Sequence, residues 1–121
     1  MIIGIGVDIV DIARFESSMR RTPALRDRLF AQSEQVVDGQ PRPFRSLAGR
    51  FAAKEALIKA IGESTGVQWH DMLVVSDPLG NPSFELSGGA AAIVAAKGIG
   101  RVHLTMSHDA GVAIAYVVAE S

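Results

Sequence analysis

Apolar side chains alternate with small or acidic ones along the first ten residues of the chain. Between Ile3 and Ile9 the odd-numbered residues are isoleucine or valine, and the even-numbered ones are Gly4, Gly6 and Asp8. Because neighbouring side chains of a strand point to opposite faces, this alternation predicts a strand with one apolar face. The opposite face carries two glycines beside Asp8, which let a ligand or another backbone segment approach closely.

Three stretches of the first half have apolar side chains at every third or fourth position, which predicts helices. Asp11 stands immediately before the first and can accept hydrogen bonds from its free amide groups, whereas Gly62 ends the last. A loop that contains glycine and proline separates the second helix from the third. The predicted helices cover residues 12–21, 23–30 and 44–61, and the loop covers residues 38–43.

The second half has mostly strand patterns. Two short apolar runs flank a turn-forming segment and predict a hairpin, and an alanine-rich helix that Ser87 can cap follows. Two longer strands complete the chain. This order predicts a single domain over residues 1–121 in the α+β class, with a mostly antiparallel sheet packed by the long central helix. The predicted strands cover residues 72–75, 83–86, 101–107 and 112–119, and the helix ends near Lys97.

The composition narrows the class of protein. With 121 residues, 48% of them hydrophobic, the chain can build one core but not two ordinary domains. A net charge of −1 disfavours a nucleic-acid binder. The lack of cysteine excludes disulfides, thiolate catalysis and cysteine-ligated zinc, and it suits a reducing compartment. Because no signal-peptide pattern and no apolar run of about 18 residues is present, we expect a cytoplasmic protein with no membrane partner.

The charges are unevenly distributed. Residues 1–59 contain ten basic and seven acidic side chains, whereas residues 60–121 contain two and six. Arginines crowd the first helical region, and two interpretations fit them: a solvated charged face, or a surface that attracts an acidic partner. These arginines are Arg14, Arg20, Arg21, Arg26 and Arg28.

Asp8 and Glu55 are the acidic side chains whose positions most favour a functional site. Asp8 lies on the glycine face of the first strand, where the alternative is a helix-capping or solvated residue. Glu55, like Lys54, lies inside or beside the apolar stripe of the long helix, where a charge needs a partner. The alternatives to a site are an internal ion pair, or side chains that extend from the edge of the stripe into solvent. If the two carboxylates converge, they suit Mg²⁺, which commonly takes one or two carboxylates and completes its shell with phosphates and waters. The stripe consists of Leu47, Phe51, Ile58 and Ile61.

Basic residues of the same helix could hold the phosphates of such a substrate. Lys59 lies one turn beyond Glu55, and Arg50 and Lys54 are one turn apart on the adjacent flank. The alternative is an ordinary helix salt bridge from Glu55 to Lys59, which contributes only a few tenths of a kcal/mol.

Two short motifs do not indicate the enzyme classes that they resemble in print. Gly4-Ile5-Gly6 lies inside a strand pattern and is not completed as a dinucleotide-binding fingerprint. Ser107-His108-Asp109 are neighbours on a strand, so their side chains point to opposite faces and cannot form a catalytic triad.

Two blocks of the sequence resemble the signatures of holo-acyl-carrier-protein synthases, the short class of 4′-phosphopantetheinyl transferases. The first runs from Gly4 to Phe15 and reads GIGVDIVDIARF, and the second runs from Arg50 to Ala60 and reads RFAAKEALIKA. The order and spacing of the blocks and the chain length also fit this class. The similarity extends to Ser33-Glu34, Gly80-Asn81-Pro82 and Ser107-His108.

The resemblance implies the fold of that family and an activity in fatty acid biosynthesis. Phosphopantetheine would pass from coenzyme A to a serine of an acyl carrier protein, with release of adenosine 3′,5′-bisphosphate. Mg²⁺ would be the cofactor, held by Asp8 and Glu55, and Lys59 would contact the phosphate under attack. For the acceptor of the serine proton, Glu55, a metal-bound water and Asp109 stay open, and we favour a water relayed by a carboxylate. The candidate coenzyme A contacts are Arg50, Lys54, Lys59 and His108.

The resemblance also implies two protein interfaces. Arg14 and Arg21 match positions that meet the acidic recognition helix of the carrier protein. Where relatives add another basic residue this chain has Ala24, which is expected to shift the contact to Arg20, Arg26 or Arg28. Members of the class assemble as homotrimers with coenzyme A between subunits, which agrees with a positive mean hydropathy of +0.23.

Two other functions fit parts of the pattern. A non-catalytic binder of acidic carrier proteins would use the arginines without Asp8 or Glu55, so metal dependence separates it from a transferase. A magnesium-dependent nucleotide phosphohydrolase would use the same carboxylates but would release phosphate or split coenzyme A without a protein acceptor, so product identity separates it.

Overall fold

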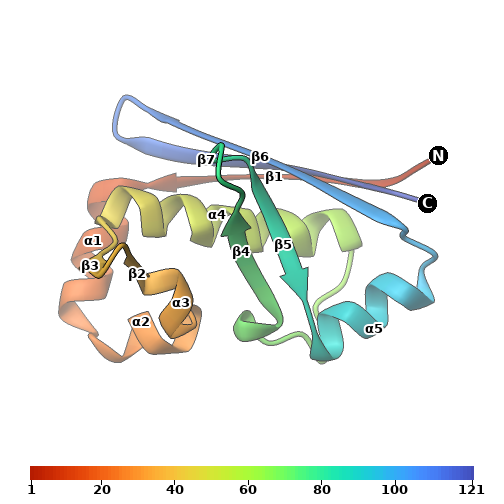
Figure 1. Ribbon diagram of the computed structural model, residues 1–121, viewed down its shortest axis with the longest axis horizontal. Coiled ribbons are helices and arrows are strands. Elements are labelled where there is room, and N and C mark those ends of the chain that lie inside the picture. The colour runs from red at the N-terminus through yellow and green to blue at the C-terminus, as the bar shows by residue number, and fades with distance from the viewer.

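A computed structural model describes all 121 residues. Its main layer is an antiparallel sheet in the order β1-β7-β6, and helix α4 runs along one face of that sheet (Figure 1). Helices α1 to α3 lie at one end of α4, and a separate β4-β5 hairpin and helix α5 lie toward the other end (Figure 1). The strands are β1 (Ile2–Asp11), β2 (Val36–Val37), β3 (Gln40–Pro41), β4 (Met72–Ser76), β5 (Pro82–Leu86), β6 (Arg101–Asp109) and β7 (Val112–Glu120). The helices are α1 (Ile12–Arg21), α2 (Ala24–Leu29), α3 (Gln32–Gln35), α4 (Phe44–Ile61), the short 3-10 helix η1 (Trp69–Asp71) and α5 (Gly88–Ala96).

The predicted α+β class and the predicted long helix are confirmed, and the structure adds short elements in two places. A helix of four residues and a two-stranded hairpin fill residues 32–41, part of which was expected to be a loop. The hairpin turns at Asp38 and Gly39, which both have positive φ. Elements of two to four residues span only about one period of a helical or strand pattern, so the sequence contains no repeat that would reveal them.

Two of the three predicted helix ends behave as expected. The Asp11 carboxylate accepts a hydrogen bond from the Arg14 amide at 2.8 Å, and Gly62 ends α4 with φ of 87°. Ser87 stands at the N-cap of α5, but its side chain makes no capping hydrogen bond. Asp71 of η1 supplies that contact instead, because its carboxylate accepts a hydrogen bond from the Gly89 amide at 3.1 Å.

The glycine face of β1 packs directly against the backbone of α4. A Cβ atom at Gly4 would lie 1.8 Å from the Ala60 carbonyl oxygen, and one at Gly6 would lie 1.9 Å from the Ala56 carbonyl oxygen. The isoleucines and valine of the opposite face are exposed, with Ile5 at 52%. The apolar face of β1 therefore points away from the core of its own chain, and the glycines bring strand and helix into direct contact.

Helix α4 is the centre of the hydrophobic core. Its alanines pack against the alanines and Val117 of β7, which allows the sheet to lie close to the helix. A second cluster of apolar side chains joins α1 and α2 to the first turns of α4. None of the helices combines the length and the apolar character that crossing a membrane requires.

Candidate functional site

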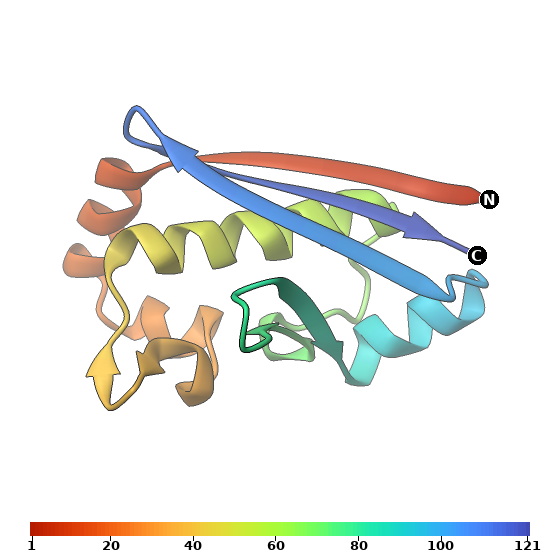
Figure 2. The same ribbon diagram turned by 45° about the horizontal axis from the view of Figure 1, so that its top comes forward.

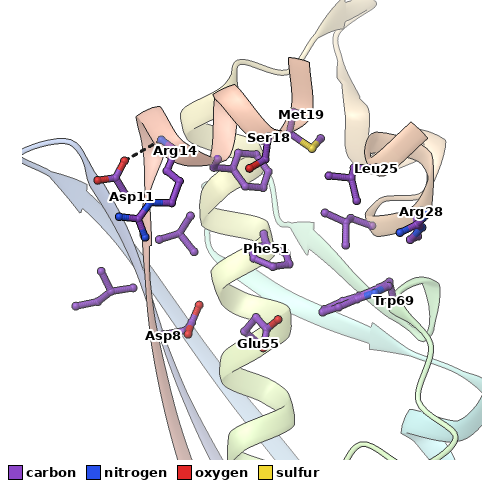
Figure 3. A pocket seen from close by; sticks show the side chains of 14 residues that line it. Asp8, Asp11, Arg14, Ser18, Met19, Leu25, Arg28, Phe51, Glu55 and Trp69 are labelled. Atoms are coloured by element: carbon purple, nitrogen blue, oxygen red, sulfur yellow. Dashed lines mark hydrogen bonds between the residues drawn. The ribbon is translucent and has the colours of Figure 1, made fainter. Parts of the chain in front are cut away.

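The structure brings Asp8 and Glu55 together at the junction of β1 and α4. Asp8 lies two residues after Gly6 on the face that packs on the helix, and Glu55 immediately precedes Ala56, whose carbonyl oxygen contacts that glycine. Both side chains line one cavity of about 570 Å³ (Figure 3). The predicted convergence of the two carboxylates is therefore present in a single chain.

The electrostatics of this pair favour a bound cation. Burial raises the pKa of the Glu55 carboxyl, the neighbouring Asp8 raises it further, and Lys59 opposes these effects. Lys59 pairs with Asp8, Nζ to Oδ1 at 3.1 Å, and also donates to the Val7 carbonyl oxygen at 2.9 Å. The alternative helix salt bridge from Glu55 to Lys59 does not form. Lys59 is thus the one positive charge that acts on both Asp8 and Glu55, whose carboxylates repel each other.

The donor set fits Mg²⁺ that keeps part of its shell for substrate and water. The chain has no group of three or more His, Asp or Glu side chains that could enclose a metal ion. Two carboxylates are the usual protein contribution to a magnesium site completed by phosphates. The geometry therefore matches a metal site shared with a phosphorylated substrate.

An apolar groove extends from the carboxylates along α1 and α2 (Figure 3). The Phe51 ring lies 5.7 Å from that of Phe15 and 5.6 Å from that of Trp69, centroid to centroid. Arg14 and Arg28 also line the cavity. A surface with an apolar floor and a basic rim suits an amphipathic acidic helix.

The other arginines of the first helical region lie elsewhere. Arg20 and Arg26 stack on Phe44, with their guanidinium carbons 5.1 and 5.3 Å from the ring centroid. Arg21 is exposed at the end of α1 and does not line the cavity. Among the three substitutes expected for the basic residue absent at Ala24, only Arg28 therefore faces the groove.

A second cavity, of about 390 Å³, has a cationic lining. It is lined by Arg42, Arg45, Arg50 and His108 together with Ser46 and Ser107. Arg50 is only 5% exposed, donates to the Ser46 hydroxyl at 2.8 Å, and keeps its buried Nε without a partner. Burial first, and then the charge of Arg42, lower the pKa of Arg50 to about 10 against the opposing effect of Glu34. A buried guanidinium with an unused donor beside other cationic groups favours bound phosphate.

Sequence reasoning missed Arg42 and Arg45 in this cavity. They lie at the loop before α4 and in its first turn, and only the packing of β6 against α4 brings them near His108. The available signal was weak: a basic Arg-Pro-Phe-Arg segment that leads into the long helix. Asp109, one of the candidate proton acceptors, lines neither cavity and accepts a hydrogen bond from the Ala110 amide.

Lys54 corrects the sequence-based prediction of a coenzyme A contact. Its side chain is fully buried, and Nζ donates to the Leu29 carbonyl at 2.7 Å, to Glu34 Oε1 at 2.8 Å and to the Trp69 carbonyl at 3.1 Å. An ammonium has three donors, so all of them are used inside the protein. The error comes from the orientation of α4 about its own axis. Lys54 and Glu55 flank the same apolar stripe, and the sequence does not reveal which of them points inward.

Comparisons with known proteins agree with this geometry. The model of the 4′-phosphopantetheinyl transferase superfamily matches residues 4–117. The holo-acyl-carrier-protein synthase of Clavibacter sepedonicus is 58% identical over 120 residues, which cover 99% of this chain and 97% of that protein. The synthase of Leifsonia xyli is 56% identical over 120 residues, covering 99% and 98%.

Solved structures of the same kind superpose on the whole fold. The crystal structure of holo-acyl-carrier-protein synthase from Neisseria meningitidis has a TM-score of 0.87 at 35% identity and covers all of both chains. The Helicobacter pylori synthase in complex with coenzyme A has a TM-score of 0.83 at 34% identity and covers 96% of this chain and 99% of that one. The resemblance of the two sequence blocks is thus confirmed, and the chain belongs to the 4′-phosphopantetheinyl transferase superfamily.

Proposed function

We propose that this protein transfers 4′-phosphopantetheine from coenzyme A to a serine hydroxyl of an apo acyl carrier protein in the cytoplasm. The observation that carries the proposal is the convergence of Asp8 and Glu55, with Lys59 beside them, at the end of a groove with a basic rim. Family membership and the similarity to a synthase solved with coenzyme A support the same reaction.

The reaction is a phosphoryl transfer. The serine oxygen attacks the phosphorus that bears the pantetheine arm, a new P–O bond forms, and the bond to the bridging oxygen breaks to release adenosine 3′,5′-bisphosphate. The serine proton passes to a water molecule relayed by one of the site carboxylates. Asp8 and Glu55 would hold Mg²⁺, which supplies positive charge to the pyrophosphate when it is bound. Lys59, which pairs with Asp8, would contact the phosphate under attack.

The arginine cavity suits the remaining phosphate groups of coenzyme A. Arg50 and Glu55 are five residues apart on α4, so at about 100° per residue they point to different sides of the helix. The two halves of a coenzyme A site therefore face different sides of one chain. Assembly of several copies would place the arginine cavity of one subunit next to the carboxylates of another.

The outer face of the sheet supports such an assembly, and we propose a homotrimer. Ile3, Ile5, Val7 and Ile9 of β1 are exposed together with Tyr116 of β7. An apolar sheet face of this kind is a typical subunit interface, because leaving it in water costs about 25 cal/mol for each Å² that association would bury.

The carrier protein would dock on the groove beside α1. Its acidic helix would meet Arg14, Arg28 and the exposed Arg21, and its apolar side chains would lie on Phe15, Phe51 and Trp69. This arrangement would direct the acceptor serine toward the carboxylate pair at the end of the groove.

Intact mass spectrometry of an apo carrier protein tests the proposal. Incubation with this protein, coenzyme A and Mg²⁺ is expected to add one phosphopantetheine to the carrier and to release an equal amount of adenosine 3′,5′-bisphosphate. Free phosphate, or split coenzyme A with an unmodified carrier, would indicate a phosphohydrolase. Carrier binding without any modification would indicate a binding module.

A further inference from the structure

A buried ion pair between Lys54 and Glu34 lies behind the wall of the groove. The Glu34 side chain is 1% exposed and that of Lys54 is fully buried, with Nζ 2.8 Å from Oε1. The Phe30 ring lies 5.1 Å from the same ammonium. Neither residue lines the groove or the arginine cavity.

The pair joins four short elements to α4 at a single point. Lys54 holds the carbonyl oxygens of Leu29, at the end of α2, and of Trp69, in η1. Glu34 of α3 accepts hydrogen bonds from the Ala31 amide at 3.0 Å and from the Val74 amide of β4 at 3.1 Å. Leu29 and Trp69 are walls of the groove. Glu55, the residue that follows Lys54, lines the same groove, and Figure 3 shows it with Trp69.

The short helices α2, α3 and η1 need tertiary contacts of this kind to keep their positions. Helix α2 has six residues, α3 has four and η1 has three, and helices this short are unstable without tertiary contacts. A buried ion pair is not an efficient source of stability, since well-packed apolar residues commonly replace one without loss. What the pair does supply is a fixed set of directed hydrogen bonds between the groove walls and α4, the helix that carries Glu55.

We propose that Lys54 and Glu34 are positioning residues that hold Leu29 and Trp69, the walls of the groove, at fixed positions relative to Glu55. This inference rests on the proposed function for its kinetic consequence, because the groove is where the carrier protein would dock. It predicts that loss of the pair weakens use of the carrier protein more than binding of coenzyme A.

The hydrogen bonds of the arginine cavity do not use the carboxylate of Glu34, although its charge raises the pKa of both Arg42 and Arg50. Arg42 Nε donates to the backbone carbonyl of Glu34 at 2.8 Å, and Arg42 and Arg50 both donate to the Ser46 hydroxyl. Changing the Glu34 side chain leaves these acceptors in place. The two ligands therefore respond differently to the same substitution, which a general loss of structure would not produce.

The test uses Lys54→Met, the double variant Lys54→Met with Glu34→Gln, and Lys97→Met as a matched control. Lys97 also donates to a backbone carbonyl at 2.7 Å, that of Ile61, but at the far end of α4. The single variant leaves a buried carboxylate without its partner and is expected to melt well below the wild type. The double variant removes that charge and is expected to recover most of the melting temperature while the Leu29 and Trp69 carbonyls still lack their donor.

Two measurements then separate the outcomes. In the folded double variant, the KM for the carrier protein is expected to rise about tenfold or more, while affinity for coenzyme A by calorimetry stays within about twofold of the wild type. Trp69 is the only tryptophan of the chain, so its fluorescence reports the wall directly. The double variant is expected to show a red-shifted emission and stronger acrylamide quenching than Lys97→Met.

A double variant with wild-type emission and wild-type carrier KM would overturn the inference, and so would an equal loss of carrier and coenzyme A binding. Failure of the proposed function looks different. The wild type would then modify no carrier protein, while the tryptophan response of the double variant would still support the positioning role.

Discussion

Gly6→Ala is expected to damage the site through the backbone, without changing any functional side chain. The added Cβ would lie 1.9 Å from the Ala56 carbonyl oxygen and 2.8 Å from the Ala60 amide nitrogen. Both are main-chain atoms of α4, so no side-chain rotation relieves the overlap. Strand β1 and helix α4 must therefore separate.

The size of the effect follows from that overlap. Carbon and oxygen rarely approach within 3.0 Å, so the gap between strand and helix must widen by roughly 1 Å, at a cost of about 1–3 kcal/mol in the free energy of unfolding. Asp8 moves with the strand and Glu55 with the helix. Since a misplacement of about 1 Å commonly costs about 100-fold in rate, kcat is expected to fall by about that factor.

The assay combines thermal unfolding with the initial rate of carrier modification by intact mass spectrometry. Gly100→Ala is the control, because the nearest heavy atom to its added Cβ, the Ser121 carbonyl carbon, is 3.3 Å away. It is expected to change stability and rate little. A Gly6→Ala protein with wild-type melting temperature and wild-type kcat would refute the idea that the glycine contact sets the carboxylate geometry.

Three further substitutions test separate parts of the account. Glu55→Gln is expected to abolish transfer yet raise the melting temperature of the metal-free protein at pH 7.5. Burial and Asp8 raise the folded-state pKa of Glu55, so its negative charge destabilises the folded protein above that pKa. The gain in melting temperature from Glu55→Gln should therefore vanish as the pH falls through about 4.5, below which the carboxyl is protonated in the unfolded chain as well. An unchanged melting temperature at pH 7.5 would count against repulsion between Asp8 and Glu55. Arg50→Met is expected to raise the KM for coenzyme A about 10- to 100-fold with little change in the carrier KM, measured by varying each substrate in turn; the reverse pattern would move coenzyme A out of the arginine cavity. Ile5→Asp is expected to convert a trimer into monomers by light scattering and to lose activity, whereas a monomeric wild type would exclude the trimer.

The sequence predicted the main elements and the carboxylate pair because each depends on a local pattern. The alternation in β1 and the helical spacing in α4 fix both elements, and the glycines beside Asp8 indicate close packing on that face. Which face of β1 points to the core was not predictable in the same way. Apolar faces normally point to the core, whereas here the glycine face packs on α4 and Ile5 is exposed.

The rest of the site depends on contacts between residues far apart in the sequence. Lys54 and Glu34 are 20 residues apart, and the helix that carries Glu34 is too short to show a period. Arg42 and His108 line one cavity only because β6 packs near the start of α4. Such groupings come from the topology, so a single sequence shows the residues but not their neighbours.

The most direct test of the central claim is the dependence of the transfer rate on Mg²⁺ concentration in the wild type and in Asp8→Asn and Glu55→Gln. The account predicts a saturable requirement for Mg²⁺ in the wild type, abolished by EDTA and restored by added metal. It predicts that either variant loses the rate even at high Mg²⁺, while both stay folded. Transfer at the wild-type rate in EDTA, or in either variant, would contradict a metal held by these two carboxylates.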